Sequence, residues 1–145
     1  MARFWEDYNL GDKSISPGRT LTDGLVTMFA ALVGYTDPFI VDEEAAKKSV
    51  FGTRVAPGSL TLAFGDKLGF DMDEETYIAL VGLEGRFKMG AKVGDTVRVE
   101  SEIVEKKPTK DPARGILIEK SIVRNQLGAE LVEVKVVNMV KRKPK

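Results

Sequence analysis

The chain contains neither cysteine nor histidine among its 145 residues. Without cysteine there is no disulfide, no thiolate nucleophile and no thiolate metal site. Without histidine, Ser–His and Cys–His nucleophilic pairs and imidazole zinc ligation are excluded as well. Any general acid or base must therefore be Asp, Glu, Lys, Tyr or water, and we expect neither a metal nor a cofactor.

The sequence also lacks an excess of either charge, since 22 Lys and Arg residues balance 22 Asp and Glu residues. Nothing in this balance attracts the chain to nucleic acid or to an anionic membrane. No apolar run is long enough to span a bilayer, and residues 1–7 lack the apolar region of a signal peptide. We therefore expect a cytoplasmic protein with no nucleic-acid or membrane partner.

Helical signals dominate the first half of the chain. Thr22 is a predicted N-cap, and Gly34 stands where a helix commonly ends. The residues between them are apolar around most of the helix circumference, which predicts a buried helix. A short surface helix over 42–49 is predicted to follow, with Asp42 as its N-cap.

The next predicted helix is also mostly apolar and has clear boundaries. Pro57 fits its first turn, and Gly69 marks its end after Leu68.

Strand patterns dominate from Thr76 onward. The inward residues of 96–105 and 130–141 alternate with polar ones, as in strands buried on one face. A short strand over 13–20 is broken by Pro17-Gly18. The other predicted strands are 77–88 and 116–125, with a polar loop at 106–114. The predicted inward residues are Val97, Val99, Ser101 and Ile103 in one strand, and Val132, Val134, Val136 and Val140 in the last.

Helices early and antiparallel strands late indicate an α+β domain. The apolar face of such a sheet must be covered, and the helix that begins near Gly58 is the natural cover. We expect one domain over residues 1–141 and a basic, disordered tail over residues 142–145.

The segment from Gly34 to Asp42, followed by Val55-Ala56-Pro57-Gly58-Ser59-Leu60, resembles the active-site segment of MaoC-like (R)-specific enoyl-CoA hydratases. That family carries G-D-x-N-P-x-H, then an acidic residue, then a small-residue turn that ends in Gly at the start of a buried helix. The frame holds at Gly34, Pro38, Asp42 and Gly58. Two chemical positions differ, because Tyr35 replaces the family's catalytic Asp and Ile40 replaces its catalytic His.

The resemblance implies a hotdog fold, in which an antiparallel sheet wraps a central helix and a helical segment overhangs its start. It also implies an acyl-CoA or enoyl-CoA thioester as ligand, with the backbone N–H near Gly58 as an oxyanion hole. Hotdog domains generally pair edge to edge, so we expect a homodimer or a hetero-oligomer with a related hotdog subunit.

The replaced positions bear directly on catalysis. An unperturbed phenol titrates at about 10, so Tyr35 is a poor base, and Ile40 carries no proton. Tyr35 is a catalytic candidate only as a hydrogen-bond donor to a carbonyl, and it can equally fill space left by its altered neighbours. Asp37 stands two residues after the lost Asp and is the candidate substitute, although it can equally bind backbone N–H groups in a local turn. Further candidate ligand contacts are Ser59, Val55, Phe39 and Ile40.

Three functions therefore remain open from the sequence. The chain can be an acyl-CoA-binding or auxiliary subunit that is impaired as a hydratase. It can be a thioesterase or an atypical hydratase that uses Asp37 with the Gly58 amide. Alternatively, it can be a structural hotdog whose pocket is plugged by Phe39, Ile40 and Phe51.

Overall fold

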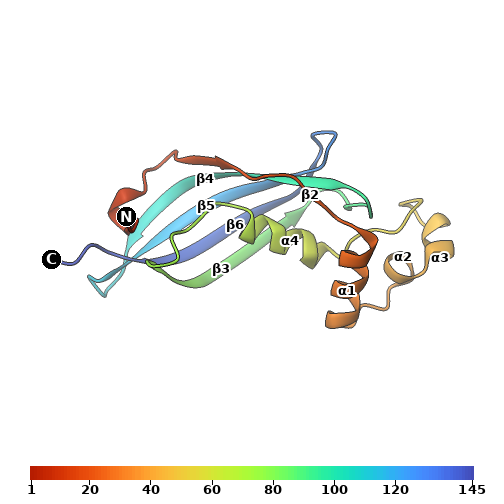
Figure 1. Ribbon diagram of the computed structural model, residues 1–145, viewed down its shortest axis with the longest axis horizontal. Helices are drawn as coiled ribbons and strands as arrows, with labels where there is room; N and C mark the ends of the chain where they lie inside the picture. The colour runs from red at the N-terminus through yellow and green to blue at the C-terminus, as the bar shows by residue number, and fades with distance from the viewer.

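A single antiparallel sheet organises the computed structural model, which describes all residues 1–145 (Figure 1). Its strands lie side by side in the order β1-β4-β5-β6-β3, and the short β2 also pairs with β4. The last strand in this order, β3, pairs only with β6 and leaves its other edge free. The strands are β1 (Lys13–Ile15), β2 (Arg19–Thr20), β3 (Tyr77–Phe87), β4 (Thr96–Pro108), β5 (Arg114–Arg124) and β6 (Glu130–Lys141).

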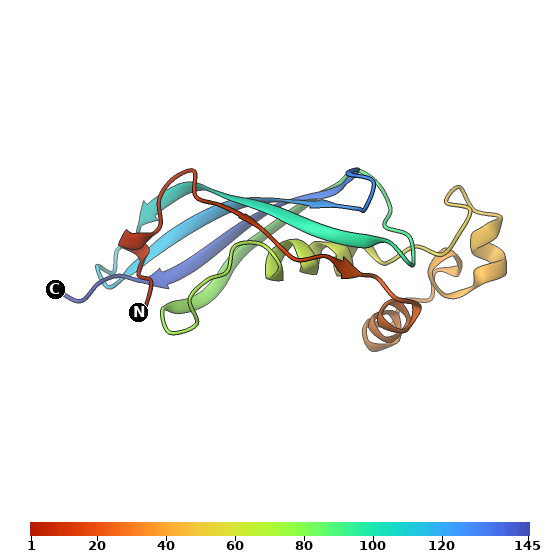
Figure 2. The same ribbon diagram turned by 45° about the horizontal axis from the view of Figure 1, so that its top comes forward.

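Helix α4 (Gly58–Lys67) lies along the concave face of this sheet (Figure 2). The approach is close because Gly65 has no side chain: a Cβ there would lie 2.4 Å from Cγ2 of Val134. Leu60 packs with Val99, Val123 and other inward strand residues in the main core. A sheet wrapped around one central helix is the hotdog arrangement, so the predicted α+β hotdog fold is confirmed.

Three further helices extend beyond one end of the sheet (Figure 1). They are α1 (Asp23–Val33), α2 (Pro38–Val41) and α3 (Glu43–Lys47). Both predicted N-caps are confirmed, because the Thr22 side chain accepts from Leu25 N and Asp42 accepts from Ala45 N. Gly34 ends α1 with φ 98°, a left-handed conformation that glycine adopts without strain. We call residues 34–54, which include α2 and α3, the overhang.

The prediction of a buried first helix is wrong for much of its surface. Val26 and Ala30 are buried, but Met28 is 71% and Leu32 is 84% exposed. The sequence shows that a helix is apolar, but it does not show how many sides the rest of the chain covers. Here α1 lies beyond the sheet, so only one of its sides meets the core.

The predicted inward faces of the strands are confirmed, since their eight residues are all at most 3% exposed.

The polar loop predicted at 106–114 is shorter than expected. Residues Lys106 to Pro108 continue β4 and pair with Leu117 to Gly115 of β5. The proline is tolerated because β1 pairs only with Glu100 to Glu102, so β4 has no neighbour on its other side at Pro108.

The two ends of the chain meet at the end of the sheet opposite the overhang (Figure 1). Tyr8 is fully buried against Leu117 and Val140, and Trp5 Nε1 donates to the Ile116 carbonyl at 2.9 Å. The tail, expected to be disordered, contacts this region: Arg142 Nε donates to Glu6 at 2.7 Å, and the Lys143 backbone N–H to the same carboxylate at 3.0 Å. No helix has the length and apolar character that crossing a membrane requires.

One carboxyl group is completely enclosed in the core. Glu119 on the inner face of β5 is 0% exposed, and its Oε2 atom has no hydrogen-bond partner. Its Oε1 accepts from Ser121 Oγ at 3.4 Å and, at the limit of hydrogen bonding, from Phe70 N at 3.5 Å. Burial raises the pKa of Glu119 to about 8, and the nearby Asp66 acts in the same direction. The side chain is therefore protonated in the folded protein at neutral pH.

We expect Glu119→Gln to remove a pH dependence of stability. The unfolded state loses the proton above about pH 4.5 and the folded state only near pH 8, so the free energy of unfolding of the wild type falls as pH rises between these values. Urea unfolding at pH 5 and pH 8 should show this fall in the wild type and a smaller one in the variant. Glu102→Gln, on the exposed side of β4, is the control. An equal fall in wild type and Glu119→Gln would contradict the assignment.

Candidate functional site

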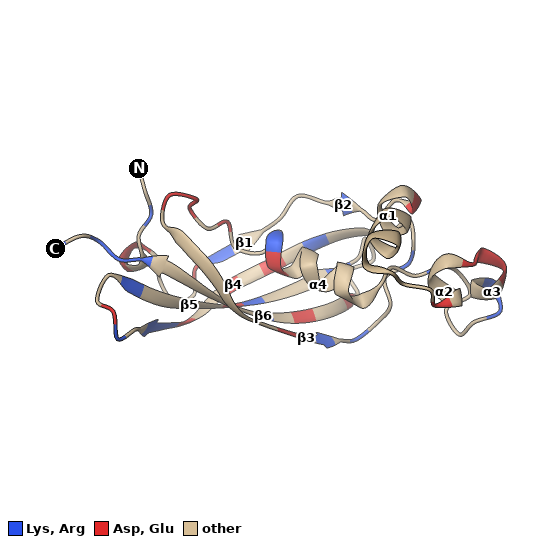
Figure 3. Ribbon diagram, turned by 90° about the horizontal axis from the view of Figure 1, so that it is seen from below, with Lys and Arg blue, Asp and Glu red and all other residues tan.

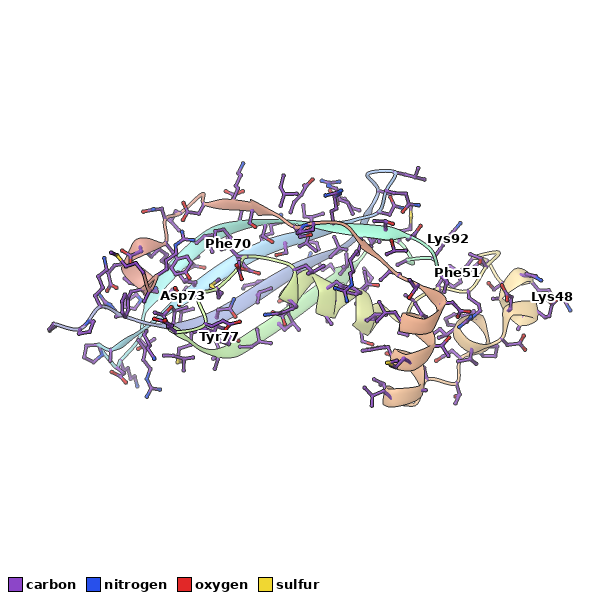
Figure 4. All side chains as sticks on the ribbon, in the orientation of Figure 1. Lys48, Phe51, Phe70, Asp73, Tyr77 and Lys92 are labelled. Carbon is purple, nitrogen blue, oxygen red and sulfur yellow. The ribbon has the colours of Figure 1, made fainter.

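A cavity of about 430 Å³ opens at the start of α4. The overhang forms one wall, the turn that precedes α4 forms the floor, and the chain after β3 forms the other wall. Figure 4 shows Phe51 and Lys92 at this end of the molecule. The wall residues include Tyr35, Asp37, Phe39, Ile40 and Phe51 from the overhang, Val55 to Gly58 and Thr61 from the turn and α4, and Phe87 to Ala91.

Backbone hydrogen bonds fix the turn that leads into α4. Val55 N donates to the Phe39 carbonyl at 3.2 Å, and Ala56 N donates to the Ala91 carbonyl at 2.7 Å. Pro57 then begins the helix, and its carbonyl accepts from the N–H groups of Leu60 and Thr61. The N–H groups of Gly58 and Ser59, which precede these, have no acceptor in the first turn. They therefore offer hydrogen bonds and a positive helix end to an anionic oxygen in the cavity.

Gly58 packs closely against the opposite wall of the cavity. A Cβ on Gly58 would lie 3.0 Å from the ring of Phe87, which forms the opposite wall of the cavity. A larger side chain would either displace this ring or fill the space next to the free amides. The absence of a side chain thus keeps the amides accessible.

The two hydroxyl groups near the cavity form a pair. Tyr35 Oη and Ser59 Oγ are 2.7 Å apart, and Tyr35 is half-buried while Ser59 is exposed. Tyr35 lines the cavity directly, whereas Ser59 reaches it only through this hydrogen bond. The pair links the overhang to the first turn of α4.

Asp37 lines the same cavity as Gly58, and its carboxylate is exposed. It occupies the N-cap position of α2 but makes no capping hydrogen bond with its side chain. The local turn role that the sequence allowed for this carboxylate is therefore not found. Asp37 is the only acidic residue in the cavity wall, and Lys88 is the only basic one.

The apolar candidates form a wall and leave the cavity open. Ile40 and Val55 are buried, at 3% and 4% exposed, and pack with Ala30 of α1. Phe39 and Phe51 cover them, with ring centroids 5.6 Å apart. The space beside Gly58 remains open, so these side chains do not plug the pocket as one of the sequence hypotheses required.

Thr61 and Phe87 were not anticipated as site residues. Thr61 follows Gly58 by three residues, which places both on the same side of α4. It is 3% exposed and lines the cavity. The helical spacing could have identified Thr61, but nothing near Phe87 in the sequence indicates that a strand end lies against the helix.

Arg54 holds the overhang in place over the cavity. Its Nε donates to the Ile40 carbonyl at 2.8 Å, and its Nη1 pairs with Asp23 at 2.6 Å. Its Nη2 donates to Thr27 Oγ1 at 3.0 Å, so one side chain joins the overhang to α1. The guanidinium beside Asp23 lowers the pKa of that carboxyl, with a further contribution from the Thr27 hydroxyl.

Charged residues are few around the start of α4. Figure 3 shows the charged residues of α4 only at its other end, where Asp66 and Lys67 lie. No group of three or more His, Cys, Asp or Glu side chains is placed to hold a metal ion. The chemistry that the site offers is therefore polarisation by backbone amides, with hydroxyl groups and one carboxylate nearby.

Comparison with known proteins agrees with this geometry. Residues 9–125 match the family described as the MaoC like domain. The chain belongs to this family. This MaoC-like domain is 35% identical over 98 residues to Protein MaoC of Klebsiella aerogenes, a match that covers 67% of the chain and 29% of that relative. It is 34% identical over 95 residues to the (R)-specific enoyl-CoA hydratase of Rhodospirillum rubrum, covering 65% of each.

A solved structure matches nearly the whole domain. It is a monoamine oxidase regulatory protein from Archaeoglobus fulgidus, with a TM-score of 0.89 and 29% identity, covering 99% of this chain and 97% of that one. The sequence relatives are matched over less than two thirds of their length, so the match does not carry their whole activity to this domain.

We expect Arg54→Met to loosen the overhang without unfolding the domain. The change removes three hydrogen bonds, one of them to a buried segment, so hydrogen exchange of amides 35–53 should accelerate by about tenfold or more. Mass spectrometry of peptic fragments measures this rate, with Arg19→Met on exposed β2 as the control. Unchanged exchange in Arg54→Met would show that apolar contacts alone hold the overhang.

Proposed function

We propose that this MaoC-like domain binds acyl-CoA or enoyl-CoA thioesters, with the thioester carbonyl oxygen on the free amides at the start of α4. The observation that carries the proposal is the cavity of about 430 Å³ that opens onto Gly58 at a helix N-terminus. Its mostly apolar wall suits an acyl chain, while the amides suit the oxygen. A relative is named an (R)-specific enoyl-CoA hydratase, which supports the same class of ligand.

The domain is impaired as a hydratase by the family route. The positions of the family's Asp and His are held by Tyr35 and Ile40, and the chain has no histidine at all. Polarisation by the Gly58 amides remains, but general acid–base catalysis by that pair is lost. The domain then serves as a binding protein or as an auxiliary subunit of a hydratase.

The domain pairs edge to edge with a second hotdog domain, either a second copy or a related subunit. Strand β3 has one free edge, and its apolar residues Leu80, Val81 and Leu83 are 40–48% exposed. A long, exposed apolar edge is normally covered in a native protein. This feature favours a homodimer or hetero-oligomer.

A second candidate function is catalytic and uses Asp37. The carboxylate lines the cavity with Gly58 and has no hydrogen bond of its own that would hold it elsewhere. It can therefore turn toward a thioester and act as a base in an atypical hydratase or a thioesterase. The open cavity argues against a purely structural role.

We expect Gly58→Val to weaken ligand binding. The new side chain meets the Phe87 ring and fills the space beside the amides, so the affinity for butyryl-CoA and crotonyl-CoA should fall by about tenfold or more. Isothermal titration calorimetry measures the affinity, and circular dichroism checks the fold. Gly24→Val, where the structure leaves open space, is the control. Absence of binding by the wild type would refute the proposal.

We expect the wild type to hydrate crotonyl-CoA ~10²–10⁴ times more slowly than the Rhodospirillum rubrum hydratase, because a general acid–base pair contributes a factor of this size. Loss of absorbance of the enoyl thioester measures the rate. Asp37→Asn tests the second candidate in the same assay and in an assay of free CoA thiol. Equal rates in Asp37→Asn and the wild type would remove Asp37 from the mechanism.

A further inference from the structure

Thr61 is the only buried polar residue in the wall of the cavity at Gly58. The residue is 3% exposed, and its hydroxyl makes no hydrogen bond within the chain. Glu119 Oε2 is the one fully enclosed side-chain atom without a hydrogen-bond partner. The Thr61 hydroxyl, which has no partner either, is therefore open to the cavity. Because buried hydroxyl groups normally have a partner, this one is available to a ligand.

Helix geometry directs this hydroxyl toward the start of α4. Gly58 and Thr61 are three residues apart, so they lie on the same side of the helix, with Cβ positions about 5–6 Å apart. Every Cα–Cβ bond of an α-helix tilts toward the helix N-terminus. The Thr61 side chain therefore lies over the turn that contains Gly58, next to the N–H groups of Gly58 and Ser59 that have no acceptor.

The usual local acceptor of a helical threonine is not used here. A threonine hydroxyl in a helix often bonds to the carbonyl oxygen three or four residues earlier. For Thr61 these are the carbonyls of Gly58 and Pro57, and the Pro57 carbonyl already accepts from Leu60 N at 3.0 Å and from Thr61 N at 3.3 Å. Since the hydroxyl bonds to neither carbonyl, its proton is free for a ligand.

The sheet fixes the side of α4 on which Thr61 lies (Figure 2). Gly65 follows Thr61 by four residues and so lies on the same side, where a Cβ would be 2.4 Å from Cγ2 of Val134. This close contact between helix and sheet explains why Thr61 is buried. Branching at Cβ also restricts the χ1 angle of a threonine in a helix to few rotamers. The hydroxyl is therefore held in few orientations, as the positioning of a ligand requires.

We propose that the Thr61 hydroxyl donates a hydrogen bond to the thioester carbonyl oxygen that is held on the Gly58 and Ser59 amides. Thr61 is then a third donor to this oxygen, and the donor comes from a side chain. This inference rests on the proposed binding of acyl-CoA at Gly58, and it adds a preference for ligands with a carbonyl group next to the sulfur. A thioether of CoA has the same sulfur and the same apolar chain, but it has no oxygen for the three donors.

Two ligands and two proteins test this hydrogen bond. Isothermal titration calorimetry measures the affinities of the wild type and of Thr61→Val for butyryl-CoA and for the thioether S-butyl-CoA. Valine keeps the branched shape of threonine and removes the hydroxyl. We expect Thr61→Val to bind butyryl-CoA about three- to tenfold more weakly, as for the loss of one hydrogen bond, and to bind S-butyl-CoA as the wild type does.

Thr61→Ser is the matched control, because it keeps the hydroxyl and should therefore keep most of the affinity for butyryl-CoA. Urea unfolding without ligand gives a second readout. Since the Thr61 hydroxyl has no partner in the chain, Thr61→Val should unfold at the same urea concentration as the wild type or at a higher one. A buried hydroxyl with a partner in the chain would instead leave that partner unpaired and lower the midpoint.

The possible failures are distinguishable. Equal affinity of Thr61→Val and the wild type for butyryl-CoA, or equal weakening for both ligands, would overturn the inference and leave the proposed function standing. A lower urea midpoint of Thr61→Val, or affinity lost equally in Thr61→Ser, would also overturn the inference alone. Absence of butyryl-CoA binding by the wild type would refute the proposed function and the inference together.

Discussion

The contact between α4 and the concave face of the sheet determines most of the structure. It depends on Gly65, because any side chain there would enter the space of Val134. With the helix pressed onto the strands, its start is fixed against Phe87 and its end against Tyr77 and the enclosed Glu119. The cavity at the start of α4 is thus placed by the packing of one helix.

Two kinds of chemistry are distinguished at the cavity beside Gly58, namely polarisation of a carbonyl group and transfer of a proton. Polarisation of a carbonyl comes from backbone amides, which any sequence with a small residue at this position supplies. Proton transfer needs a titratable side chain, and in our proposal the cavity has only the Tyr35 phenol, the Asp37 carboxylate and Lys88 to supply one. A domain of this fold can therefore keep the backbone amides of the cavity while the side chains that transfer protons differ.

The sequence predicts the helices and strands better than it predicts what each of them packs against. The N-caps at Thr22 and Asp42 and the alternating residues of β4 and β6 follow from local rules, and these predictions are confirmed. The exposure of α1 could not be predicted, since it depends on where the sheet ends. For the site, the likeness to hydratases locates Gly58 and the overhang. The sequence gives no sign that Phe87 lines the cavity, because its place depends on which strand end meets the start of α4.

Hydrogen bonds from Arg142 and Lys143 to the Glu6 carboxylate hold the two ends of the chain together. Figure 1 shows both termini at the end of the sheet away from the overhang. Ends this close are the condition under which circular permutation and domain insertion are tolerated. Another domain can therefore be joined at either end of the chain while the entrance to the cavity beside the overhang stays clear.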